Sequence, residues 1–128
     1  MFGIMTRIKK RMNRNRSELL IKKRFETVEI YKLYKKRTVN VVMLGDSLMS
    51  SVDWNELLGR DDVANRSLGG DYTDGFLTRL ESVYDLNPKI CFVMGGVNDL
   101  PETSIVEVYG NFQSIVEGLI SHNITQKA

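Results

Sequence analysis

One serine lies in a setting that suits a nucleophile, within the segment Gly45-Asp46-Ser47-Leu48. The apolar run at 39–44 predicts a buried strand that ends at Gly45, and a helical stretch is expected after it. Ser47 is therefore expected at a strand–helix turn, where backbone N–H groups stabilise an anion. Its hydroxyl needs a base within hydrogen-bond reach, and attack on an ester also needs donors for the oxyanion. The alternative is that Ser47 only caps the helix.

Two further polar, glycine-rich segments each follow an apolar run. They are Asn65-Arg66-Ser67-Leu68-Gly69-Gly70-Asp71 and Gly95-Gly96-Val97-Asn98-Asp99. In an open parallel α/β sheet, ligands bind outside the carboxyl ends of the strands, so all three segments are expected at one edge. The N–H groups of Ser47 and of a glycine in the second segment, with the amide of Asn98, can then hold an oxyanion.

Two carboxylates beside these positions, Asp46 and Asp71, are candidates for the border of a substrate site. The alternative is that both order their loops, because aspartate side chains often bond nearby backbone groups. Asn98 has a similar alternative as a simple turn residue after two glycines.

Motifs of other enzyme classes do not fit the sequence. The lipase elbow Gly-x-Ser-x-Gly needs a glycine at position 49, which is Met49. Neither a P-loop nor the dinucleotide fingerprint Gly-x-Gly-x-x-Gly occurs.

The elements that position these segments alternate along the chain. Strands are predicted at 39–44, more weakly at 62–68, and at 89–94; helices are predicted at 52–58, at 73–86 and after Pro101. The apolar face of the last helix is expected to hold five residues: Ile105, Tyr109, Phe112, Val116 and Leu119. This alternation indicates a parallel sheet covered on both faces. A fourth strand is due after the last helix, so the architecture looks cut short.

The first part of the chain differs in charge from the rest. Residues 1–40 hold 13 Lys or Arg and 3 Asp or Glu, whereas residues 41–128 hold 5 and 13. We expect two regions: a basic helical extension at 1–37 and an α/β domain at 38–128. Residues 1–16 are predicted to be frayed or weakly helical, and a helix is predicted from an N-cap at Ser17 to residue 37.

Three functions are open for the segment 1–37. It can pack on the domain as a solvated helix, or attach to an anionic membrane surface through the stripe Ile4, Ile8 and Met12. Nucleic-acid binding is the least supported, because no recognised binding module accompanies the charge.

Composition is ordinary for a globular protein, with 42% hydrophobic and 27% charged residues. No apolar run is long enough for a membrane span, and no secretory signal is recognisable at the start. The single cysteine, Cys91, lies in an apolar run and is expected to be an inert core thiol. We therefore expect a cytoplasmic protein, with membrane-peripheral attachment as a second option.

The three segments, with Leu44-Gly45-Asp46-Ser47-Leu48 as the first, resemble in order and spacing the first three sequence blocks of the GDSL/SGNH hydrolase family. The second block is similar to those of bacterial esterases and platelet-activating-factor-acetylhydrolase-like members. The resemblance implies a flavodoxin-like three-layer α/β/α sandwich, here its first three βα units with an N-terminal helix. It also implies Ser47 as nucleophile, Gly70 and Asn98 in the oxyanion hole, and ester hydrolysis without a metal or cofactor.

The chain departs from the family at the fourth block, Asp-x-x-His, which is absent. The only histidine, His122, lies at the end of the last predicted helix and is expected to be solvated. The first hypothesis is therefore an esterase domain that is truncated and nearly inactive alone. The second is a non-catalytic domain of the same fold that binds an acyl or O-acetylated ligand or assembles with a partner. Polysaccharide acetyl esters, lysophospholipids and small acyl esters are all open as substrates, and an uncovered strand edge makes a homo-oligomer plausible.

Overall fold

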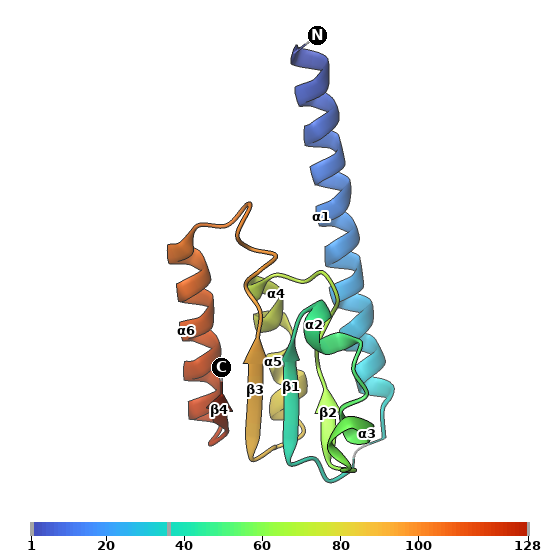
Figure 1. Ribbon diagram of the computed structural model, residues 1–128, viewed down its shortest axis with the longest axis vertical. Coiled ribbons are helices and arrows are strands. Elements are labelled where there is room, and N and C mark those ends of the chain that lie inside the picture. Colours follow the sequence, from blue (N-terminus) through green and yellow to red (C-terminus); the bar gives the residue numbers. More distant parts are fainter. Residues whose placement is uncertain (1, 36, 128) are drawn as a thin grey trace.

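The computed structural model describes residues 2–35 and 37–127, and it contains one parallel sheet. Its strands are β1 (Val41–Gly45), β2 (Val63–Asn65), β3 (Ile90–Met94) and β4 (Thr125–Lys127), in the order β2-β1-β3-β4 (Figure 1). Val41 of β1 is in register with Val63 on one side and Ile90 on the other. The predicted parallel α/β architecture is confirmed, and β1 lies between the two strands that carry the other polar loops.

The sheet has a short fourth strand where only three were expected within the chain. Thr125 pairs with Ile90, and the Thr125 N–H donates to Lys89 O at 3.0 Å. Asn123, with φ 57°, turns the chain back from the last helix toward this strand. The strand consists of three polar residues at the sheet edge, so it carries no apolar pattern that predicts it.

The connecting helices are shorter than predicted. They are α2 (Ser47–Ser50), α3 (Trp54–Leu58), α4 (Thr73–Thr78), α5 (Leu80–Tyr84) and α6 (Ile105–Ser121). The single helix predicted at 73–86 is interrupted at Arg79, whose backbone has φ −107° and ψ −1°. The predicted face of this segment is nevertheless correct, because Phe76, Leu80 and Val83 are all buried.

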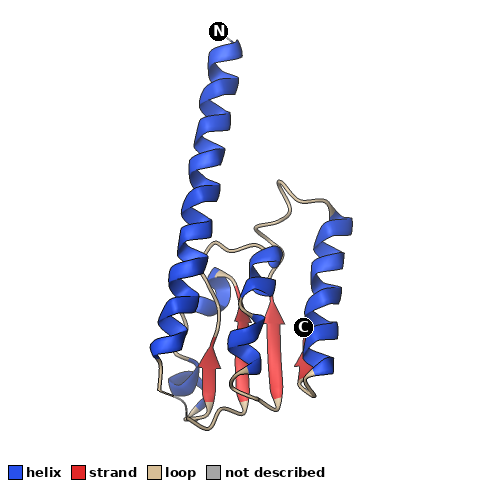
Figure 2. Ribbon diagram, turned by 180° about the vertical axis from the view of Figure 1, so that it is seen from behind, coloured by secondary structure: helices blue, strands red, loops and turns tan. Residues whose placement is uncertain are grey.

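The two faces of the sheet are covered unequally. On one face, the alternate residues Val42, Leu44, Cys91 and Val93 form the main core with α4, α5 and α6. Figure 2 shows α4 and α5 lying across this face. On the other face, α2 and α3 cover β1 and β2 through a second cluster: Val41, Met43, Met49, Val63 and Trp54. Phe92 and Met94 of β3 also point to this second face, and they are 37% and 50% exposed.

Half of α6 extends past the sheet. Ile115 and Leu119 are fully buried, but Ile105 and Tyr109 are 80% and 70% exposed, so the expected apolar face is wrong at its N-terminal end. Figure 1 shows why, because α6 begins beyond the carboxyl ends of the strands, where the sheet offers nothing to pack against.

One continuous helix, α1 (Phe2–Leu33), precedes the sheet. Residues 2–16 are helical, which fits the weakly helical alternative and not the frayed one, and the expected helix start at Ser17 is wrong. Ser17 lies inside the helix, where its hydroxyl donates to Asn13 O at 3.0 Å. The helix also ends at Leu33 and not at 37; Met1, Lys36 and Ala128 lie outside the described residues. The N-terminal half of α1 projects beyond the rest of the molecule (Figure 1).

Candidate active site

The first polar loop follows β1, the strand in the middle of the site. Asp46 is 1% exposed, and its carboxylate accepts from Leu48 N at 3.0 Å, which caps α2. Ser47 comes next, as the first residue of α2, and its side chain is exposed. Within the described part of the chain, the Ser47 hydroxyl has no hydrogen-bond partner. The loop therefore presents a free hydroxyl at the tip of the strand.

The second loop lies directly against the first. Leu68 N donates to Gly45 O at 3.0 Å, and the Ser67 hydroxyl donates to Met43 O at 3.2 Å. A Cβ placed on Gly69 would lie 4.0 Å from the Cβ of Ser47. Gly70 follows with φ +76°, in the left-handed region that favours glycine, and it is exposed.

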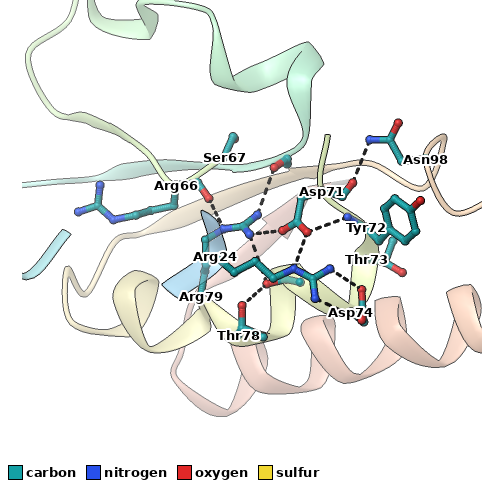
Figure 3. Close-up of polar contacts among 12 residues, drawn as sticks. Arg24, Arg66, Ser67, Asp71, Tyr72, Thr73, Asp74, Thr78, Arg79 and Asn98 are labelled. Atoms are coloured by element: carbon teal, nitrogen blue, oxygen red, sulfur yellow. Dashed lines mark hydrogen bonds and ion pairs between the residues drawn. The ribbon is translucent and has the colours of Figure 1, made fainter. Parts of the chain in front are cut away.

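The third loop joins the second through Asn98 and the first through Gly95. The Asn98 side-chain amide donates to the backbone oxygen of Asp71 at 2.9 Å (Figure 3). A Cβ on Gly95 would lie 3.6 Å from Asp46 Oδ2. The carboxylate of Asp99 accepts from the Thr73 hydroxyl at 2.8 Å, which ties this loop to the start of α4. The three strand tips therefore converge, as their order in the sheet requires.

Buried ion pairs hold the second loop in place. Asp71 and Arg79 are both 0% exposed, and Nη1 of Arg79 pairs with Oδ2 of Asp71. The same guanidinium donates to Arg66 O at 2.9 Å and to Gly45 O at 3.2 Å, so it links β1 to the second loop (Figure 3). A buried guanidinium needs such partners, because an unpaired buried charge is costly. Sequence patterns gave no signal for this role of Arg79.

The helix α1 contacts the second loop at two points. Nε of Arg24 donates to Asp71 Oδ1 at 2.7 Å, and Nη2 donates to Asp74 Oδ1 at 2.8 Å. The guanidinium of Arg66, which is 6% exposed, lies 4.3 Å from the centre of the Tyr31 ring. Burial lowers the pKa of Arg66 and raises the pKa of Tyr31. The extension therefore helps to position the loop that contains Gly70.

The two aspartates predicted at the substrate border face the protein itself. Asp71 lies between Arg79 and Arg24, and Asp46 bonds its own loop. Neither carboxylate has appreciable exposed surface for a ligand. Their placement fits the alternative interpretation, in which they order the loops.

The single histidine lies far from the loops. His122 follows α6, its ring stacks on Tyr84 with the centroids 3.6 Å apart, and its Nδ1 is 2.9 Å from Gly118 O. Because α6 runs from the carboxyl edge of the sheet to the amino edge, His122 and Ser47 are at opposite ends (Figure 1). The sequence contains no other histidine that could act as the base.

A polar groove of about 510 Å³ borders the second and third loops. Tyr72, Asp99, Thr103 and Asn111 are among the residues that line it, between α4 and α6. The Tyr72 hydroxyl donates to Glu102 at 3.2 Å, and burial, then the charge of Glu102, raise the pKa of Tyr72. Among residues 2–35 and 37–127, no three or more His, Cys, Asp or Glu side chains are grouped to hold a metal ion. No helix in the same ranges has the length and apolar character of a membrane span.

Comparison with solved structures gives the class of the fold. No protein-family model matches the chain, and no curated protein sequence does. A putative lipolytic protein of the G-D-S-L family from Desulfitobacterium hafniense DCB-2 matches with a TM-score of 0.61 and 19% identity, over 70% of this chain and 57% of its own. An acetyl xylan esterase matches with a TM-score of 0.59 and 20% identity, over 69% and 56%. The chain therefore has the α/β fold of the GDSL/SGNH hydrolases over the part that it spans.

One match covers more of the chain and therefore extends into the N-terminal helix. A structure from Streptococcus pneumonia, described as a putative platelet activating factor, matches with a TM-score of 0.72 and 19% identity. It covers 90% of this chain and 57% of its own. The chain spans a little more than half the length of these structures.

Proposed function

We propose that this chain is the nucleophile-bearing part of an SGNH-type serine esterase that hydrolyses carboxylic esters. The observation that carries the proposal is the free, exposed hydroxyl of Ser47, which lies next to Gly69 in the loop that also contains Gly70. The fold relation to known esterases supports the same class. In this proposal, residues 38–128 carry the hydrolase part and residues 1–37 are an extension.

The mechanism assigns one role to each loop. Ser47 Oγ attacks the acyl carbon and passes its proton to a base. The N–H groups of Ser47 and Gly70 and the side-chain amide of Asn98 hold the oxyanion, and each such donor contributes roughly 100- to 1,000-fold in rate. The amide nitrogen of Asn98 carries two hydrogens, so one can bond Asp71 O while the other points to the oxyanion. The alcohol then leaves with the proton, and water hydrolyses the acyl-enzyme.

The base in this proposal comes from outside the 128 residues. His122 follows α6, which ends at the amino edge of the sheet, whereas Ser47 follows β1 at the carboxyl edge, so His122 is not placed to accept a proton from Ser47. The chain alone is therefore expected to hydrolyse esters slowly, because serine catalysis relies on a general base.

A second candidate is a non-catalytic domain that binds an acyl or O-acetylated ligand or assembles with a partner. It is favoured by the lack of a base and by the exposed Phe92 and Met94 next to the edge strand β4. Such a domain needs the loops but not the reactivity of Ser47.

The test supplies the missing base as free imidazole. The protein is incubated with a fluorophosphonate probe, and the adduct is measured by intact mass and located by peptide mapping. The Ser47 oxygen displaces fluoride from phosphorus, and imidazole takes the proton. We expect labelling that rises with imidazole, is lost in Ser47→Ala and is kept in the matched control Ser67→Ala. Labelling that is equally slow in wild type and Ser47→Ala would favour the second candidate.

A further inference from the structure

The projecting half of α1 exposes large apolar side chains. Every residue from 3 to 19 is exposed, and Ile4, Met5, Ile8, Met12 and Leu19 are 53% to 67% exposed. Figures 1 and 2 show this half of the helix standing clear of the sheet and its covering helices. No part of the described chain covers these side chains, so they are available to an external surface.

The apolar residues lie on one side of the helix. Ile4, Ile8 and Met12 follow one another at intervals of four, and the helical period of about 100° per residue places Met5 and Leu19 within the same stripe. We call these five residues the projecting stripe. The rest of the surface is basic, because six Lys or Arg and no Asp or Glu precede Glu18.

The projecting stripe does not lie on the side of α1 that docks on the domain. The side of α1 that docks on the domain is marked by Arg24, which pairs with Asp71, and by Tyr31, which lies under Arg66. The same helical period places this docking side about a third of a turn from the stripe. A flat surface can therefore meet the stripe without a collision with the domain.

We propose that residues 2–19 form an interfacial helix that binds anionic lipid surfaces, with the projecting stripe in the headgroup boundary. Basic residues around a narrow apolar stripe fit this occupant, because cations attract anionic headgroups while the stripe buries apolar area. A second copy of the helix fits less well, because two basic helices repel each other. Nucleic acid matches the charge but leaves the apolar stripe unexplained. The proposal does not depend on the esterase activity.

The experiment is flotation of the full chain with vesicles. We expect binding to vesicles that contain phosphatidylglycerol, little binding to phosphatidylcholine alone, and clear weakening when salt is raised. Binding to both vesicle types with no effect of salt would overturn the proposal.

Two variants test the two parts of the helix surface. The triple variant Ile4→Ser, Ile8→Ser, Met12→Ser is expected to lose about tenfold or more in vesicle affinity, because the buried apolar area is lost. The triple variant Lys9→Gln, Lys10→Gln, Arg11→Gln is expected to show a similar loss at low salt. The matched control replaces by serine three apolar residues elsewhere that are even more exposed: Ile105, Val106 and Tyr109.

The other occupants give distinct results. Duplex DNA binding that survives the serine variant and is lost in the glutamine variant, without vesicle binding, would indicate a nucleic-acid surface. A concentration-dependent dimer in sedimentation, abolished by the serine variant, would indicate a second copy. Either result would overturn the proposal, as would full vesicle binding by the serine variant.

Discussion

The two faces of strand β3 behave differently although their residues alternate along five positions. Cys91 and Val93 are 0% and 4% exposed beneath α4–α6, whereas Phe92 and Met94 on the other face are 37% and 50% exposed. The covered face also carries the buried pair of Asp71 and Arg79. The difference shows that the chain builds one covering layer over the main strands of the sheet and the other only over β1, β2 and the first residue of β3, Ile90. Stability should therefore respond to changes on the covered side and hardly at all on the open side.

The largest effect is expected from the buried ion pair. Asp71→Asn leaves Arg79 charged in a site without solvent, so the free energy of unfolding should fall by about 3–5 kcal/mol. Urea unfolding followed by circular dichroism measures it. Asp74→Asn is the matched control, because Asp74 pairs with Arg24, as Asp71 also does, but its side chain is 61% exposed. This variant should lower the free energy of unfolding by less than about 1 kcal/mol. Equal losses in the two variants would contradict the covered-side argument.

A smaller loss is expected where α1 attaches to the covered side. Arg24→Met removes hydrogen bonds to Asp71 and Asp74 and should lower the free energy of unfolding by about 2 kcal/mol. Imidazole-dependent labelling of Ser47 should also slow, because Asp71 holds the loop that contacts Asn98. Lys22→Met, with a side chain that is 71% exposed, should change stability by less than about 0.5 kcal/mol. If Arg24→Met were as stable as Lys22→Met, the contact between α1 and the second loop would not contribute to stability.

The pKa and the reactivity of the Cys91 thiol indicate whether the covered face of β3 is buried. Burial raises its pKa from 9.0 to about 12, so the folded state favours the neutral thiol. The stabilisation from the neutral Cys91 thiol should be fully present below pH 9 and should be lost as the pH rises toward 12. The difference in the free energy of unfolding between wild type and Cys91→Ala, followed against pH, measures it. Ellman's reagent at pH 8 should react with Cys91 only after unfolding in urea. Rapid reaction of the native protein would mean that this face opens.

The smallest effect is expected on the open face. Phe92→Ser should change the free energy of unfolding by less than about 0.5 kcal/mol, whereas Val93→Ala next to it should cost about 2 kcal/mol. Any self-association seen by sedimentation should weaken in Phe92→Ser, because apolar surface beside an edge strand favours pairing. A large loss of stability in Phe92→Ser would mean that this face is covered in solution.

Sequence patterns predicted the features that depend on local order. Alternating runs and glycine stops predicted the three main strands, and the parallel sheet then required the three polar loops to lie at one edge. The polar strand at Thr125–Lys127 was missed because it forms only by pairing with β3. The ion pair of Arg24 with Asp71 joins residues 47 positions apart, a separation that no local pattern reports.

The extent of the helices could not be predicted for a related reason. The apolar stripe of α6 predicted a face, but the neighbours that bury it exist only along its C-terminal half. The continuity of α1 was missed because its first half is basic and is not buried by any other described part of the chain. The break at Arg79 accompanies a buried guanidinium that bonds the end of β1 and two residues of the second loop.

Gly45 lets the ends of β1 and β3 lie close together because it has no Cβ. A Cβ at this position would collide with the backbone oxygen of Met94 and lie 2.7 Å from the sulfur of Met49. The backbone oxygen cannot swing aside as a flexible side chain can. A single added methyl group would therefore push the end of β1 away from the end of β3. In the proposed mechanism, Ser47 and Asn98, which follow those two strand ends, would then be too far apart to act on the same carbonyl group.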